Sequence, residues 1–81
     1  MTDRTAALQR CFAATFPGLA EEAIPTASVD SVAEWDSLTS LTLVALLEEE
    51  FDVEISELDL PELRSYEDVR EYLQRENRLP A

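Results

Sequence analysis

The chain has 81 residues, enough for one small domain, and 46% of them are hydrophobic, which argues against disorder. The chain has 18 acidic residues and 6 basic ones, all of which are arginine. The resulting net charge of −12 excludes nucleic acid and anionic membranes as partners. The chain has one cysteine, no basic start followed by an apolar run, and no stretch of membrane-spanning length. It is therefore expected to be cytoplasmic.

The first predicted element is a helix from Asp3 to Phe16, capped by Thr2 or Asp3 and ended by Pro17 and Gly18. Side chains at helical spacing predict its buried stripe: Leu8, Cys11, Phe12, Thr15 and Phe16. The lone Cys11 is interpreted as a small buried hydrophobic residue rather than a reactive thiol.

A long loop, residues 19–35, follows and contains Pro25. A connection of this length needs anchoring in so small a domain, and we expect Ile24, Val29 and Val32 to provide it. Trp35 ends the loop and has two candidate roles. It either packs and fixes where the second helix begins, which is favoured, or contacts a partner or a bound group.

The second predicted helix, Thr39 to Phe51, is opened by the run Glu34-Trp35-Asp36-Ser37-Leu38. Leu43, Leu47 and Phe51 form the spine of its buried side, with Val44, Leu46 and Glu50 on the same half. The other half carries Leu38, Leu41 and Ala45, with Thr42, Glu48 and Glu49 beside them. Leucines followed by acids favour a docking surface there, although the preceding loop covering Leu38 and Leu41 is an alternative.

After Phe51, an extended segment is predicted to place Val53 and Ile55 inward. A single helical turn is predicted from Ser56 to Leu60, limited by Pro61. Ser65 is predicted to cap a last helix whose inward stripe is Tyr66, Val69, Tyr72 and Leu73. These elements predict an all-α fold, a small three- to four-helix bundle with a long loop between the first two helices. We expect one domain over residues 1–81, with a folded core of about 3–75 and a frayed tail from Glu76 to Ala81.

Catalytic chemistry is not expected from this chain. It has no His or Lys that could activate a serine. The absence of His and the single Cys exclude any common metal-ligand set, and Gly18 as the one glycine excludes a glycine-rich phosphate loop. Ser37 at a helix start is instead a candidate acceptor, modified by another enzyme, where outward backbone N–H groups favour a phosphodiester. The alternative is that Ser37 or Asp36 only caps the helix.

The Asp36-Ser37-Leu38 motif, followed by a helix ending Leu47-Glu48-Glu49-Glu50-Phe51, resembles the acyl carrier protein family over most of the chain, to about Leu73. The resemblance implies that Ser37 carries 4'-phosphopantetheine, derived from coenzyme A, whose thiol holds acyl groups as thioesters. Asp36 and Leu38 match the recognition residues that flank the serine. The positions that match the partner-facing side of the helix are Leu41, Ala45, Glu48 and Glu49.

The resemblance also implies the partners: a phosphopantetheinyl transferase, and acyl-loading and acyl-processing enzymes with basic docking patches, which meet a monomeric carrier. Two positions depart from carriers of fatty-acid synthesis. Trp35 stands where those commonly have Gly, and Thr42 where many have an acid. Both departures favour polyketide, hybrid peptide or other specialised biosynthesis. The alternative function is an unmodified acidic helical interaction module, a degenerate carrier that only docks.

Overall fold

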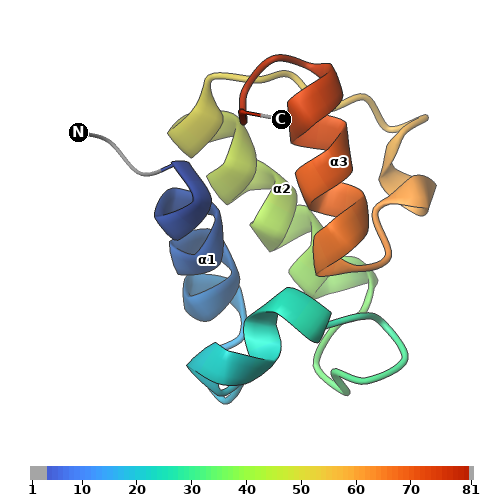
Figure 1. The fold of residues 1–81 in the computed structure, drawn as a ribbon. Helices are drawn as coiled ribbons and strands as arrows, with labels where there is room; N and C mark the ends of the chain where they lie inside the picture. Colours follow the sequence, from blue (N-terminus) through green and yellow to red (C-terminus); the bar gives the residue numbers. More distant parts are fainter. Residues whose placement is uncertain (1–3, 81) are drawn as a thin grey trace.

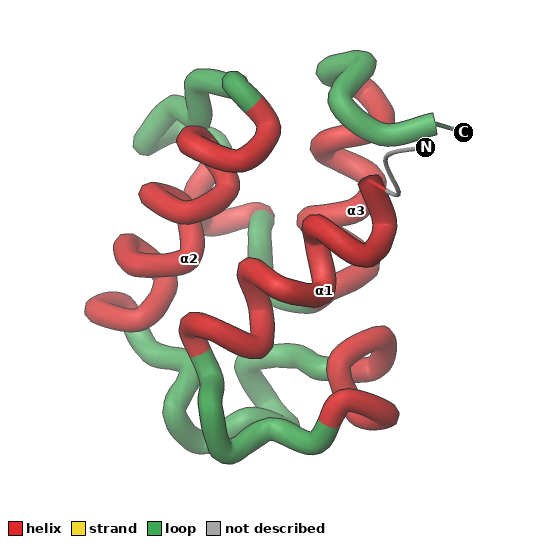
Figure 2. Tube along the Cα trace, turned by 90° about the vertical axis from the view of Figure 1, so that its left-hand side faces the viewer, coloured by secondary structure: helices red, strands yellow, loops and turns green. Residues whose placement is uncertain are grey.

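The computed structural model describes residues 4–80, and their regular structure is entirely helical apart from one isolated bridge between Ser28 and Ser65. In chain order the elements are α1 (Arg4–Thr15), η1 (Glu21–Thr26), α2 (Ser37–Phe51), η2 (Leu60–Glu62) and α3 (Tyr66–Arg75). The α-helices enclose one core, and the connection between α1 and α2 closes one end of the bundle (Figure 1). In the view of Figure 2, α1 lies in front, with α2 and α3 to either side. The predicted all-α bundle is confirmed.

Helix α1 buries the predicted stripe, together with Ala7. It ends at Thr15, whose hydroxyl donates to the Cys11 carbonyl at 2.8 Å, and the following Phe16 is also buried. Pro17 then prevents the helix from continuing. The expected caps, Thr2 and Asp3, lie outside the described residues.

The connection before α2 contains a 3₁₀ helix that the sequence pattern did not predict. This helix, η1, has Pro25 inside it and buries a single side chain, Ile24. The predicted anchoring residues are confirmed: Ile24 and Val32 are buried, and Val29 is partly buried against the core. The connection is also tied to the start of α3, because the Tyr66 N–H donates to the Ala27 carbonyl at 2.9 Å.

Between α2 and α3, Val53 and Ile55 are buried as predicted. The predicted turn of helix from Ser56 to Leu60 is wrong in position, since the short helix is η2, Leu60–Glu62, and Pro61 lies inside it. Proline is tolerated in the first turn of a helix, where its missing N–H is not needed. Upstream, the Ser56 hydroxyl accepts from the Leu58 N–H at 3.1 Å and forms a local turn instead.

Helix α3 begins at its predicted cap, where the Ser65 hydroxyl accepts from the Asp68 N–H at 3.0 Å, and its predicted inward stripe is buried. The predicted fraying from Glu76 is wrong for the described residues. The helix ends in a Schellman motif: Asn77 has φ 60°, its N–H donates to the Gln74 carbonyl, and the Arg78 N–H donates to the Leu73 carbonyl at 2.7 Å. This turn directs Leu79 onto the core, where only 7% of it is exposed, so the folded core extends past residue 75.

Candidate functional site

The start of α2 is organised by Asp36. Its carboxylate Oδ1 accepts from the backbone N–H groups of Leu38 and Thr39, both at 3.0 Å. In return, the Thr39 hydroxyl accepts from the Asp36 N–H at 2.9 Å, which completes a reciprocal capping box. Asp36 is therefore the helix cap, and Ser37 is the first helical residue. The interpretation of Ser37 as a cap is wrong, and its exposed side chain is left for another role.

The same hydrogen bonds settle the charge at this end of the helix. The N–H of Thr39, with that of Leu38, holds the pKa of the Asp36 carboxyl below its ordinary value, so Asp36 is ionised at neutral pH. The Ser40 N–H is also bonded, to the Asp36 carbonyl at 2.9 Å. The expected outward-pointing N–H groups are thus largely occupied, and a carboxylate stands next to Ser37 in their place.

Trp35 fixes the position of this helix start. Trp35 is 4% exposed. The centroid of its ring lies 5.6 Å from that of Phe12, in edge-to-face geometry, and 5.3 Å from that of Phe16. The indole N–H donates to the Ser40 hydroxyl at 3.1 Å and so connects the core directly to the first turn of α2. The predicted packing role of Trp35 is confirmed. The alternative role, contact with a partner or a bound group, is limited to the small part of Trp35 that lines the groove beside Ser37.

Ser37 borders an open groove of about 380 Å³. The groove lies between the start of α2 and the segment from η2 to α3, and its lining is Val29, Trp35, Asp36, Ser37, Ser40, Leu60, Pro61, Leu63 and Arg64. A hydrogen bond from the Val29 N–H to the Arg64 carbonyl, at 2.9 Å, holds two of these segments together. The lining residues after position 59 were not predicted to belong to the site. An exposed serine beside a groove with both apolar and polar walls fits a long, flexible group attached to the Ser37 hydroxyl.

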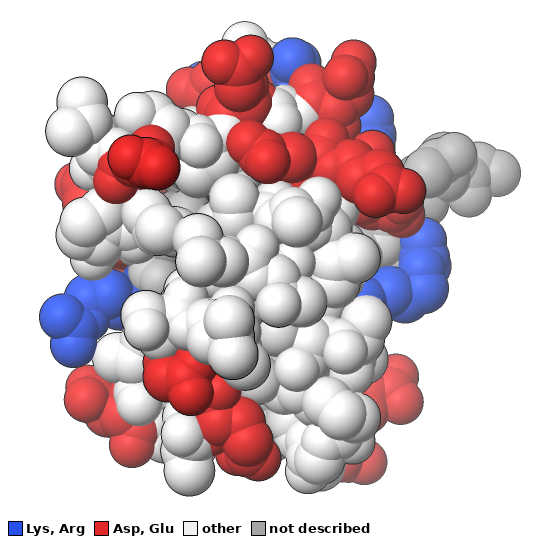
Figure 3. All heavy atoms as spheres, turned by 180° about the vertical axis from the view of Figure 1, so that it is seen from behind, with Lys and Arg blue, Asp and Glu red and all other residues white. Residues whose placement is uncertain are grey.

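The outer face of α2 is apolar in its first half. Leu38 and Leu41 are 73% and 57% exposed, so the alternative that the preceding loop covers them is wrong. Figure 3 shows this side of the molecule: an uncharged area faces the viewer, with acidic side chains gathered above and below it. Ala45 and Glu49 are exposed on the helix as well.

Two glutamates of α2 are occupied within the chain. The Glu48 carboxylate accepts from the Ile55 N–H at 2.9 Å, and Glu48 is only partly exposed. Glu50, expected on the buried half of the helix, is exposed and pairs with Arg10 at 3.4 Å. Of the two glutamates predicted to recognise partners, Glu49 is therefore the freer one.

Other chemistry is poorly supported in the described part of the chain. Residues 4–80 contain no group of three His, Cys, Asp or Glu side chains that could hold a metal ion. Burial raises the pKa of the Cys11 thiol to about 11, so its thiolate is scarce at neutral pH. Among the same residues, no helix has the length and apolar character needed to cross a membrane.

Comparison with known proteins gives two findings. Residues 6–73 match the family model described as a phosphopantetheine attachment site. The chain is also similar to an acyl carrier protein of Syntrophus aciditrophicus (strain SB), with 43% identity over 58 residues, which are 72% of each chain.

Proposed function

We propose that Ser37 is the attachment residue, because this chain belongs to the acyl carrier protein family, whose members bear a phosphopantetheine attachment site. Members of this family are carriers rather than catalysts. The observation that carries the proposal is the position of Ser37, exposed as the first residue of α2 and at the edge of the groove. Its neighbours make the capping hydrogen bonds, which leaves the Ser37 hydroxyl available.

When bound, 4'-phosphopantetheine supplies a thiol that carries acyl groups as thioesters. This chain contributes the position of that group and a surface for docking. Attachment forms a bond between the Ser37 Oγ and the phosphorus of coenzyme A that carries the pantetheine, and adenosine 3',5'-bisphosphate leaves. The base that takes the hydroxyl proton must come from the transferase, because this chain has no His or Lys and Asp36 is committed to the helix cap.

The docking surface we propose is the outer face of α2 from Asp36 to Glu49. Leu38, Leu41 and Ala45 give a partner an apolar contact, and Glu49 gives it a charge that suits basic side chains. Glu48 can contribute to the field, but pairing with a partner would compete with its bond to Ile55.

The pathway is also part of the proposal. Trp35 and Thr42 depart from fatty-acid carriers, and on these two positions we infer a role in polyketide, hybrid peptide or other specialised biosynthesis. The exposed Thr42 leaves the middle of the docking face uncharged, which is consistent with partners that differ from those of fatty-acid synthesis. A monomeric state and a cytoplasmic location stay predictions.

The decisive experiment is intact-mass measurement after incubation with coenzyme A and a broad-specificity phosphopantetheinyl transferase. We expect the wild type to gain one phosphopantetheine and Ser37→Ala to gain none. Ser40→Ala is the matched control for the site of attachment, because Ser40 lines the same groove one turn along α2. Like the wild type, it should gain one phosphopantetheine by the end of the reaction, although more slowly, because it loses the hydrogen bond from Trp35. Modification of Ser37→Ala, or none of the wild type by several transferases, would refute Ser37 as the acceptor.

The competing function, a module that only docks, predicts a different pattern. Under it, Ser37→Ala retains function and Glu49→Lys loses it. Glu49 is the suitable position for charge reversal, since the same change at Glu48 would also remove the hydrogen bond to Ile55.

A further inference from the structure

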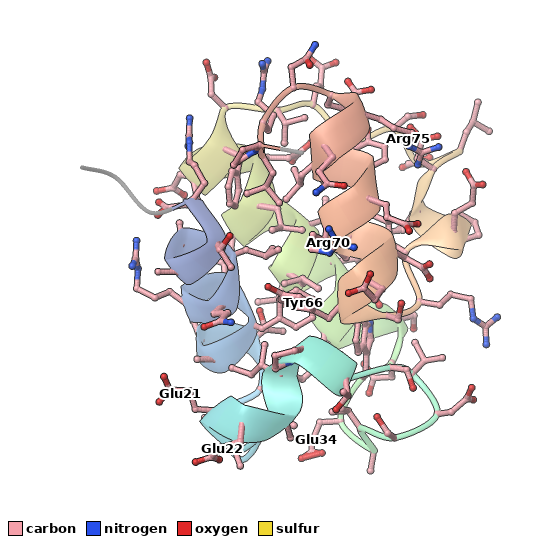
Figure 4. All side chains as sticks on the ribbon, in the orientation of Figure 1. Glu21, Glu22, Glu34, Tyr66, Arg70 and Arg75 are labelled. Carbon is pink, nitrogen blue, oxygen red and sulfur yellow. The ribbon has the colours of Figure 1, made fainter. Side chains whose placement is uncertain are left out.

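One of the six arginines differs from the other five in its surroundings. The five engaged arginines are Arg4 over the Phe51 ring, Arg10 beside Glu50, Arg70 beside Glu67, Arg75 over the Tyr72 ring and Arg78 on the Asp52 carbonyl. Within residues 4–80, no such partner meets the guanidinium of Arg64, whose hydrogen bonds are made by its backbone. Figure 4 shows Arg70 and Arg75 on α3, some distance along the helix from its start.

An unpaired guanidinium is unexpected in a domain with 18 acidic residues. The Asp68 carboxylate accepts from the backbone N–H of Arg64 at 3.2 Å and makes no ion pair with its side chain. Arg64 is exposed and lines the groove that Ser37 borders. Its backbone is held there by the bond from Val29. A free cation is thus kept at the edge of the candidate attachment site.

The opposite charge is concentrated at Ser37. The Asp36 carboxylate, next to Ser37 in the sequence, accepts from the N–H groups of Leu38 and Thr39, and Glu34 is exposed two residues before Asp36. Figure 4 shows Glu34, Glu21 and Glu22 at this same end of the bundle. A phosphodiester on Ser37 would add another negative charge to this end without the full benefit of the helix N-terminus. A cation from elsewhere in the domain would offset this charge.

We propose that Arg64 binds the phosphodiester attached to Ser37 and so directs the attached group along the groove. The planar guanidinium can donate two parallel hydrogen bonds to the two non-bridging phosphate oxygens. Leu60, Pro61 and Leu63, which line the groove beside Arg64, then give the arm an apolar wall. The inference rests on the proposed modification of Ser37 and concerns a positioning residue, not a catalytic one.

The test compares wild type, Arg64→Gln and Arg75→Gln in the unmodified and modified forms. Both variants lose one positive charge, but Arg75 lies outside the groove. The ³¹P resonance of the phosphodiester should shift in Arg64→Gln and stay at the wild-type position in Arg75→Gln. Added salt should move the wild-type resonance toward that of Arg64→Gln, because the contact is exposed.

Thermal melting gives a second readout. The melting temperature of the modified form minus that of the unmodified form should be lower in Arg64→Gln than in wild type by about 1 to 5 °C, the range expected for one exposed ion pair. Equal ³¹P shifts and equal differences in melting temperature for all three proteins would overturn the contact while leaving Ser37 as the acceptor. Failure of the wild type to be modified at all would overturn both.

Discussion

Replacing Trp35 by Phe tests whether one buried indole fixes the start of α2. The change keeps an aromatic ring against Phe12 and Phe16 but removes the N–H that donates to Ser40 at 3.1 Å. We expect a loss of about 1 kcal/mol for the hydrogen bond and about 1 to 2 kcal/mol for the lost packing. A domain of this size has a free energy of unfolding of only about 5 to 12 kcal/mol, so the total should lower the melting temperature by on the order of 10 °C.

The assay is urea unfolding of wild type, Trp35→Phe, Ser40→Ala and the double variant. The double-mutant cycle should give a coupling energy of about 0.5 to 1.5 kcal/mol between Trp35 and Ser40. Phosphopantetheine loading of Trp35→Phe should also be slower, because the first turn of α2 loses its tie to the core. A coupling energy near zero would refute the claim that this bond positions the helix, whatever the total loss of stability.

Two further predictions concern the end and the start of helices. Leu79→Ala should lower the free energy of unfolding by about 2 to 3 kcal/mol in urea titration, because Leu79 is only 7% exposed. A loss under about 0.5 kcal/mol would instead support the prediction that the C-terminal tail is frayed. Asp36→Ala should lower the melting temperature at neutral pH, while Asp36→Asn, which can still cap, should lower it less. Because folding lowers the pKa of Asp36, its charge stabilises the fold above the unfolded pKa of about 4, and this contribution disappears as pH falls through the folded value. A difference between wild type and Asp36→Ala that stays constant from neutral pH to pH 3 would contradict this assignment.

The α-helices were predictable because their signals are local. Apolar side chains recur at helical spacing in α1, α2 and α3, and residues such as Pro17 and Ser65 mark where helices stop and start. Such patterns need no knowledge of the rest of the fold. The same reasoning placed Trp35 in the core, since a large aromatic residue just before a helix favours packing.

The errors fall where local signals are weak or tertiary contacts decide. Helix η1 buries only Ile24, so no periodicity could mark it. The turn at η2 was misplaced because Pro61 was interpreted as a stop, although proline also suits a first helical turn. Leu79 is the one large apolar residue of the C-terminal segment, and its burial depends on Asn77 adopting a left-handed conformation. A single asparagine after a helix is a weak sequence signal for that turn.

The candidate site divides in the same way. Ser37 and the exposed leucines were accessible from a motif and a helical wheel. The groove was not, because Leu63 and Arg64 line it together with Ser37 only in the folded chain. The hydrogen bond from Val29 to Arg64, which holds the two connections together there, cannot be predicted from the sequence. The diversion of Glu48 to the Ile55 N–H is likewise a tertiary event.

Asp36 brings opposing requirements together at one residue. As the cap it makes Ser37 the first helical residue and leaves the serine exposed, which is what an acceptor needs. In doing so it occupies the N–H groups that would otherwise favour a phosphate, and it adds its own negative charge. The compensating cation must then lie outside the helix. On the proposed function, Arg64 supplies it across the groove when the carrier is free, and basic side chains of a docked enzyme can compete for the same phosphate.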